Sequence, residues 1–170
     1  QMKAVLLLQS LFESLLKIDR NETNLLFRIF KKKRDKNLPK GLYLWGGVGR
    51  GKTFLMDLFF DSLPLKRKTR LHFHRFMMAV HLALSEFQGR PNPLNLVAEK
   101  FHKEASVLCF DEFYVSDIGD AMLLDGLLQE MFSMGMTFVA TSNVPPQRLY
   151  ENGLQRAKFL PAIALIEKHT

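Results

Sequence analysis

Cysteine is almost absent from this sequence, since Cys109 is the single thiol among 170 residues. An internal disulfide is therefore excluded, and such a composition is typical of a protein from a reducing compartment. No apolar run approaches the roughly 20 residues that a helix needs to span a bilayer. No signal peptide is visible either, but the sequence begins at Gln1, so we expect it to be a fragment of a longer chain.

Acidic residues are fewer than basic ones, 17 against 24, which leaves a net charge of +7 at pH 7. This balance allows a nucleic acid or an acidic protein surface as a partner. Five of the basic residues lie within residues 31–36, shortly before Pro39. No aromatic residue is interleaved with them, as a stacking platform for single-stranded nucleic acid would require. The run is therefore either a solvated loop or a contact with nucleic acid.

Apolar residues are abundant: 47% of the chain is hydrophobic, with 15 phenylalanines and 8 methionines. A chain of this length and composition forms one domain with a sizeable core. Apolar residues recur at helical spacing over residues 3–17, and a second helical segment is expected over residues 24–30. We therefore expect a helical extension with a basic loop over residues 1–40, followed by an α/β core over residues 41–170.

A glycine-rich loop follows a short apolar run at residues 42–45, which predicts a buried strand. The fixed positions of the phosphate-binding P-loop pattern are all filled, by Gly46, Gly51, Lys52 and Thr53. Glycines let backbone N–H groups turn toward phosphate oxygens, while the lysine supplies a positive charge and the threonine an Mg²⁺ ligand. A chance match in a glycine-rich turn is the alternative. The residues predicted to bind the nucleotide are Gly46, Gly47, Val48, Gly49, Arg50, Gly51, Lys52 and Thr53.

Two acids end a second informative strand. Residues 107–110 are apolar and lead into Asp111 and Glu112, and open α/β sheets bind ligands outside the carboxyl ends of their strands. Asp111 is predicted to hold Mg²⁺ through water, and Glu112 to act as the general base that polarises the attacking water. A pair of solvated acids after a core strand is the alternative. Residues 137–143 predict another buried strand, and its terminal Asn143 is expected to bond the γ-phosphate or the lytic water.

Two features indicate which nucleotide is bound and what happens to it. A second carboxylate beside the Mg²⁺-binding aspartate favours hydrolysis over transfer to a hydroxyl substrate. The Asn-Lys-x-Asp tetrapeptide that recognises guanine does not occur in the sequence. We therefore expect an Mg²⁺-dependent ATP hydrolase.

Strands and helices alternate along the core, which predicts a three-layer P-loop fold with a mainly parallel sheet. A strand is predicted over residues 71–76, with His72 and His74 on one of its faces. The two histidines either bind a metal, although no third ligand is apparent, or line a polar edge of the nucleotide or partner surface. Helices are predicted over residues 52–63, 77–88, 93–104 and 120–132 and from residue 161, with Asn92 and Asp117 as N-caps and Gly135 as the terminator of its helix.

Several of these segments resemble the ZapE family of bacterial cell-division ATPases, an AAA+-related family with mitochondrial relatives. The matching segments are residues 42–53, 71–76, 108–113, 140–143, 152–156 and 159–163, so that the resemblance covers about residues 40–169. It implies an AAA+-type core that acts on FtsZ polymers in an ATP-dependent way. It also implies a cytoplasmic protein that is recruited to the division septum.

The same resemblance implies that Arg156 is an arginine finger, supplied in trans to the ATP of a neighbouring subunit in a self-associated form. A surface arginine on a helix is the alternative. Family members continue well beyond residue 170, so the helical C-terminal lid and its second sensor arginine are expected to be missing from this sequence.

Two other functions remain open at this point. A nucleic-acid-associated ATPase of the helicase-loader type would use the net positive charge and residues 31–36. A nucleotide-gated scaffold would bind ATP and hydrolyse little of it.

Overall fold

The structure is a computed structural model that describes residues 2–23 and 39–170. Its strands are β1 (Leu42–Trp45), β2 (Lys68–His72), β3 (Val107–Asp111) and β4 (Thr137–Ser142). Its helices are α1 (Met2–Thr23), α3 (Lys52–Ser62), α4 (Phe73–Glu86), α5 (Pro93–Glu104), α6 (Ile118–Ser133) and α7 (Leu160–His169), with the short 3-10 helices η1 (Pro146–Arg148) and η2 (Arg156–Lys158).

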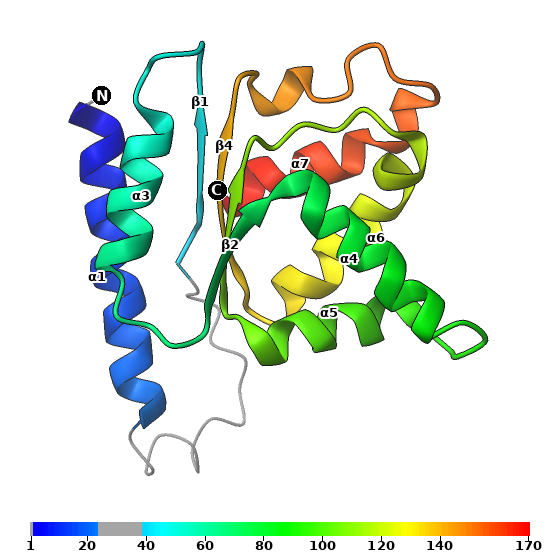
Figure 1. Ribbon diagram of the computed structural model, residues 1–170, viewed down its shortest axis with the longest axis horizontal. Coiled ribbons are helices and arrows are strands. Elements are labelled where there is room, and N and C mark those ends of the chain that lie inside the picture. Colours follow the sequence, from blue (N-terminus) through cyan, green and yellow to red (C-terminus); the bar gives the residue numbers. More distant parts are fainter. Residues whose placement is uncertain (1, 24–38) are drawn as a thin grey trace.

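The strands form one parallel sheet in the order β1-β4-β3-β2. Helices cover both faces of this sheet, with α1 and α3 on one side and α4 to α7 on the other (Figure 1). The predicted three-layer α/β fold with a parallel sheet is therefore confirmed.

Strand β3 shows why the sheet needs a helical layer on each face. Its residues are all apolar before Asp111, and successive side chains of a strand point to opposite faces. Val107 and Cys109 pack in the core below α1 and α3, whereas Leu108 and Phe110 pack in the core of the other layer. Burial on both faces explains the continuous apolar run that sequence reasoning used to identify this strand.

Phenylalanine rings fill the core between the sheet and α4. The ring centroids of Phe73 and Phe113 lie 4.2 Å apart, those of Phe76 and Phe110 lie 4.8 Å apart, and Phe138 lies 4.9 Å from Phe110. Aromatic pairs at these separations add to the stabilisation from burial. Because Phe73 begins α4 and Phe113 follows β3, this cluster anchors both segments beside the carboxyl ends of the strands.

The strand predicted over residues 71–76 is wrong. Strand β2 ends at His72 and α4 begins at Phe73. The apolar residues of 71–76 fit an alternating strand, but Phe73, Phe76 and Met77 also have helical spacing, and all three are buried on one face of α4. His72 and His74 therefore do not share a strand face. Among residues 2–23 and 39–170, no group of three His, Cys, Asp or Glu side chains could hold a metal ion.

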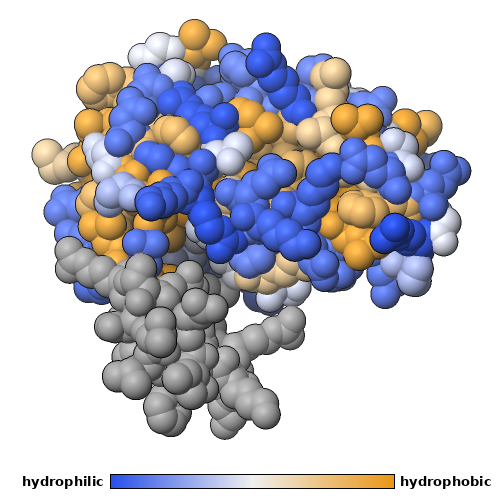
Figure 2. All heavy atoms as spheres, turned by 60° about the horizontal axis from the view of Figure 1, so that its bottom comes forward, coloured by the Kyte–Doolittle hydropathy of each residue, from blue (hydrophilic) through white to orange (hydrophobic). Residues whose placement is uncertain are grey.

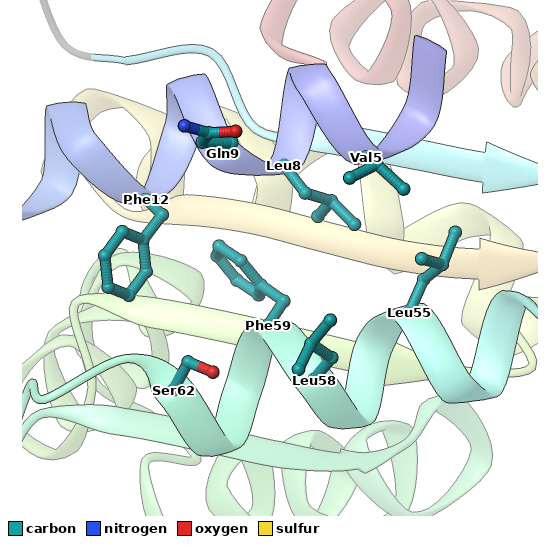
Figure 3. Close-up of a pocket in the computed structure, with 8 residues that line it drawn as sticks. All are labelled: Val5, Leu8, Gln9, Phe12, Leu55, Leu58, Phe59 and Ser62. Carbon is teal, nitrogen blue, oxygen red and sulfur yellow. The ribbon is translucent and has the colours of Figure 1, made fainter. Parts of the chain in front are cut away.

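Helix α1 extends further than the predicted 3–17 and packs against α3. Figure 3 shows Leu8 and Phe12 of α1 turned toward Phe59 of α3 across an apolar groove of about 180 Å³. Leu8 and Phe59 are buried, so apolar contact joins the N-terminal helix to the layer over the sheet. The helix predicted over residues 24–30 and the basic run 31–36 lie outside the described residues.

The predicted helix caps have mixed outcomes. The side chain of Asp117 accepts hydrogen bonds from the backbone N–H groups of Gly119 and Asp120, at 2.6 and 3.1 Å, so its N-cap role is confirmed. Gly135 follows the C-cap of α6 with a φ of 84°, as a terminating glycine should. Asn92 precedes α5 but makes no side-chain cap bond, because its backbone is left-handed, with a φ of 51°.

Across the part of the chain that the structure describes, none of the helices has the length and apolar character needed to cross a membrane.

Candidate active site

The P-loop joins the carboxyl end of β1 to the start of α3. Gly49 and Gly51 have φ values of 77° and 73°, a left-handed conformation that favours glycine. A Cβ atom built on Gly47 or Gly49 would meet no heavy atom within 4 Å, so the loop borders open space. The first N–H groups of a helix lack partners within the helix, and the helix dipole adds positive potential there. The loop and the start of α3 therefore form a cradle suited to an anion.

Lys52 is the first residue of α3, and its side chain reaches back to the loop. Its Nζ donates to the carbonyl oxygens of Gly46 at 2.6 Å and Gly47 at 2.9 Å, and to Oδ1 of Asn143 at 3.2 Å. Asn143 reaches the lysine because β1 and β4 are neighbours in the sheet. The structure thus brings together two residues that sequence reasoning had selected from segments about 90 positions apart.

Tyr43 of β1 helps to hold the chain just beyond Asn143. Its hydroxyl donates to the carbonyl oxygen of Val144 at 3.1 Å. Burial raises the pKa of Tyr43 to about 12, above the ordinary value of about 10, so the hydroxyl remains a donor over a wider range of pH. The sequence offered no signal for this contact, which joins residues far apart in the chain.

Glu112 has an unusual backbone for a residue that is not glycine, with a φ of 53°. Its N–H donates to Oγ1 of Thr141 at 3.2 Å, and the next N–H, of Phe113, donates to the Thr141 carbonyl at 2.7 Å. The Glu112 side chain is 81% exposed, and its Oε2 lies 3.9 Å from Nδ1 of His72. The carboxylate is therefore accessible at the edge where the carboxyl ends of β2, β3 and β4 lie.

Asp111 has the opposite environment, because its side chain is only 15% exposed. Nε of Arg70 donates to Oδ2 of Asp111 at 2.7 Å, and NH2 of the same guanidinium donates to Oδ1 at 3.1 Å. The remaining nitrogen, NH1, donates to Oδ1 of Asp57 at 2.5 Å. Hydrogen bonding to Asp111, more than to Asp57, raises the pKa of Arg70 above its ordinary value, although burial acts against it.

Sequence reasoning missed Arg70 and Asp57. Arg70 lies in a basic segment that matches no motif. The strand predicted from the sequence began at residue 71, one residue after Arg70, whereas β2 spans Lys68–His72. Asp57 did carry a signal, because it follows Thr53 by four residues and therefore lies on the same face of α3.

The residues present fit the predicted Mg²⁺–ATP ligand in chemistry. Mg²⁺ prefers oxygen ligands and keeps several waters, and Thr53 and Asp111 offer a hydroxyl and a carboxylate. Each carboxylate oxygen has two lone-pair sites, so the Asp111 oxygens that accept from Arg70 can still accept from a metal-bound water. The glycine cradle and Lys52 supply the donors that a triphosphate needs.

Arg156 lies apart from these residues. It begins η2, and Figure 1 shows the segment after β4, in orange to red, on the side of the sheet away from α3. Its NH2 donates to the carbonyl oxygen of Gln147 at 2.5 Å. Its Nε is buried and has no hydrogen-bond partner among the described residues. Within one chain, Arg156 therefore contacts η1, and the structure does not bring it to Lys52.

A protein family and several known proteins resemble this chain in sequence. A family model described as "AFG1-like ATPase" matches residues 1–170. "Cell division protein ZapE" of Escherichia coli strain K12 is 61% identical over 140 residues, which cover 82% of this chain and 37% of that protein. "Lactation elevated protein 1 homolog B" of Danio rerio is 44% identical over 142 residues, covering 77% of this chain and 28% of that protein. The chain therefore spans about a third of the length of these curated relatives.

Two solved structures share the fold. Domain III of the replication initiation protein DnaA from Thermotoga maritima matches with a TM-score of 0.56 and 22% identity, over 76% of this chain and 52% of that chain. A crystal structure of DnaI matches with a TM-score of 0.55 and 21% identity, over 83% of this chain and 74% of that chain. At such identities the likeness shows the P-loop α/β fold alone.

Proposed function

The chain belongs to the AFG1-like ATPase family, and from this premise we propose that residues 41–170 form the hydrolytic core of an Mg²⁺-dependent ATPase. The contact between Lys52 and Asn143, with Nζ and Oδ1 3.2 Å apart, carries the proposal. It joins the P-loop, which is predicted to bind the phosphates, to the polar end of β4, where Asn143 is predicted to bond the γ-phosphate or the lytic water. Phosphoryl transfer depends mainly on such positioning and on electrostatics.

Each residue of the site has a role in the proposed mechanism. The P-loop backbone and Lys52 bind the β- and γ-phosphates, while Thr53 and Asp111 hold Mg²⁺. Mg²⁺, when bound, neutralises charge on the phosphates. Glu112, whose side chain is 81% exposed, accepts a proton from the attacking water. Asn143 orients that water or the γ-phosphate.

We assign the last positive charge of the site to Arg156, acting in trans. The finger would have to give up its hydrogen bond to the Gln147 carbonyl and reach the ATP of a neighbouring subunit. An arginine finger contributes about 10³- to 10⁵-fold in rate. Because this assignment places the finger in trans, the complete site would form only when the protein self-associates.

For the partner we propose a cytoskeletal polymer of the bacterial division ring, FtsZ, acted on in the cytoplasm at the septum. The support is the 61% identity to a relative named as a cell division protein and the resemblance of the motif segments to that family. ATP hydrolysis would then drive remodelling of the polymer.

The test is ATP turnover by the full-length protein with and without FtsZ polymer, followed in parallel by light scattering. We expect Mg²⁺-dependent turnover and an ATP-dependent change in scattering. Lys52→Ala should lose both, because the phosphates lose their main side-chain charge.

Other outcomes would identify the competing functions. Turnover that is stimulated by DNA in a salt-sensitive way, with unchanged scattering, would contradict the polymer proposal and indicate a nucleic-acid-associated ATPase. ATP binding without measurable turnover in the full-length protein would indicate a nucleotide-gated scaffold.

A further inference from the structure

Arg70 connects two elements of the nucleotide site through one side chain. It lies on the edge strand β2, opposite Cys109 of β3, and its side chain is only 18% exposed. Three of its nitrogens donate to carboxylates, two to Asp111 and one to Asp57. Asp57 belongs to α3, one turn after Thr53, so the guanidinium bridges the P-loop helix and the end of β3.

The position of the guanidinium has an electrostatic consequence. Without it, Asp57 and Asp111 would be two carboxylates with no counter-charge between them, and carboxylate oxygens are ligands that hard divalent cations bind. Arginine keeps its charge at every accessible pH, and charges at hydrogen-bond range in a protein interact by several times RT. Arg70 therefore opposes the entry of a bare divalent cation.

We propose that Arg70 makes cation binding at Asp111 depend on the nucleotide. Its guanidinium lies between the two carboxylates and offsets their charge, so that a divalent cation binds at Asp111 tightly only when a triphosphate brings additional negative charge. Arg70 is thus a positioning residue that acts through Asp111. The inference rests on the proposed function, because Asp111 is the residue proposed to hold the Mg²⁺ of Mg²⁺–ATP.

The experiment measures Mn²⁺ binding to the full-length protein by electron paramagnetic resonance, with and without a non-hydrolysable ATP analogue. Without nucleotide, Arg70→Gln should bind Mn²⁺ at least tenfold more tightly than the wild type, because the two carboxylates lose their counter-charge. Arg70→Lys should show a smaller gain of about threefold, because one ammonium group cannot pair with both carboxylates. Adding Asp111→Asn to Arg70→Gln should remove the gain.

Arg148→Gln is the matched control, since Arg148 is an exposed arginine paired with Glu151, and its Mn²⁺ binding should equal that of the wild type. If Arg70→Gln and Arg70→Lys bind Mn²⁺ no better than the wild type, the inference is wrong. If circular dichroism shows that Arg70→Gln is unfolded, the Mn²⁺ affinity of Arg70→Lys alone tests the inference. A gain that survives Asp111→Asn would also overturn the inference.

Failure of the proposed function would also remove the nucleotide dependence of cation binding, but it gives a different result from failure of the counter-charge role of Arg70. An ATP analogue that does not tighten Mn²⁺ binding to the wild type would contradict the proposed Mg²⁺–ATP site. The nucleotide-free comparison of Arg70 variants tests the counter-charge by itself.

Discussion

Asp111 and Glu112 are neighbours in the sequence, yet their side chains are 15% and 81% exposed. The left-handed backbone of Glu112 separates them, and two hydrogen bonds to Thr141 hold the turn. Such a conformation costs about 1–3 kcal/mol for a residue other than glycine, so surrounding contacts must maintain it. The turn directs the Asp111 carboxylate to Arg70 and leaves the Glu112 carboxylate facing solvent. This arrangement suits the roles proposed for them, a metal ligand for Asp111 and a general base for Glu112.

Glu112→Gln tests the second of these roles. The amide keeps the size of the side chain and does not accept a proton from water, so we expect ATP affinity within about threefold of the wild type and a kcat lower by about 10²- to 10⁴-fold. Nucleotide binding by fluorescence and turnover by phosphate release measure the two effects. Glu151→Gln, an exposed acid paired with Arg148, is the control and should change neither; wild-type turnover by Glu112→Gln would refute the assignment.

At the scale of secondary-structure elements, two basic residues near β2, Arg67 and Lys68, donate hydrogen bonds to the C-terminal ends of helices. Nζ of Lys68 donates to the carbonyl oxygens of Leu63, at 2.6 Å, and of Phe60, both at the end of α3. Arg67 donates to the carbonyl oxygen of His102 in the last turn of α5. Cations near a helix C-terminus pair with its free carbonyls and its dipole. Part of the positive charge that suggested nucleic acid therefore has a structural use.

The N-cap of α6 offers a test of element stability. Asp117→Ala removes the acceptor for two N–H groups, so we expect the free energy of unfolding to fall by about 1 kcal/mol, as measured by chemical denaturation. Asp125→Ala is the control, since among the described residues this acid accepts hydrogen bonds only from Gln129, within the same helix. Such pairs contribute about 0.2–0.5 kcal/mol, and an equal loss in both variants would contradict the cap assignment.

At the scale of the whole molecule, the residue proposed as an arginine finger, Arg156, does not lie with the other candidate site residues in the described part of one chain. Lys52, Thr53, Asp111, Glu112 and Asn143 lie at the carboxyl end of the sheet, whereas Arg156 contacts Gln147 in η1. Figure 2 shows another face, on which hydrophobic residues occur in separate patches between hydrophilic ones. Because Arg156 contacts Gln147 of its own chain, the proposed self-association is tested by measuring turnover.

Mixing two inactive variants provides that test. Arg156→Ala should keep nucleotide binding and lose about 10³- to 10⁵-fold in turnover, and Lys52→Ala should lose binding. If the finger acts in trans, the mixed full-length proteins should recover part of the turnover, because an intact P-loop then meets an intact finger. Equal melting temperatures of Arg156→Ala and the wild type control for the lost Gln147 contact. No recovery would indicate action in cis, and ordinary turnover by Arg156→Ala would remove the assignment.

The sequence alone determined the parts of this protein that depend on local pattern. The P-loop residues, the apolar strand ending at Asp111 and the strand ending at Asn143 could each be identified within a few residues, and their alternation with helices predicted the layered fold. Their meeting at one edge could also be predicted, since the carboxyl ends of parallel strands lie together. The boundary at Phe73 was missed because its apolar neighbours fit both a strand and a helix.

Only the tertiary structure decided how the acids at that edge are used. Arg70 and Asp111 are 41 residues apart in the sequence, and their contact depends on the pairing of β2 with β3 in a register that no local pattern specifies. Asp57 joins them because α3 packs against the same part of the sheet. Pairing register and packing are properties of the assembled chain, so the counter-charge on Asp111 became visible only in the folded molecule.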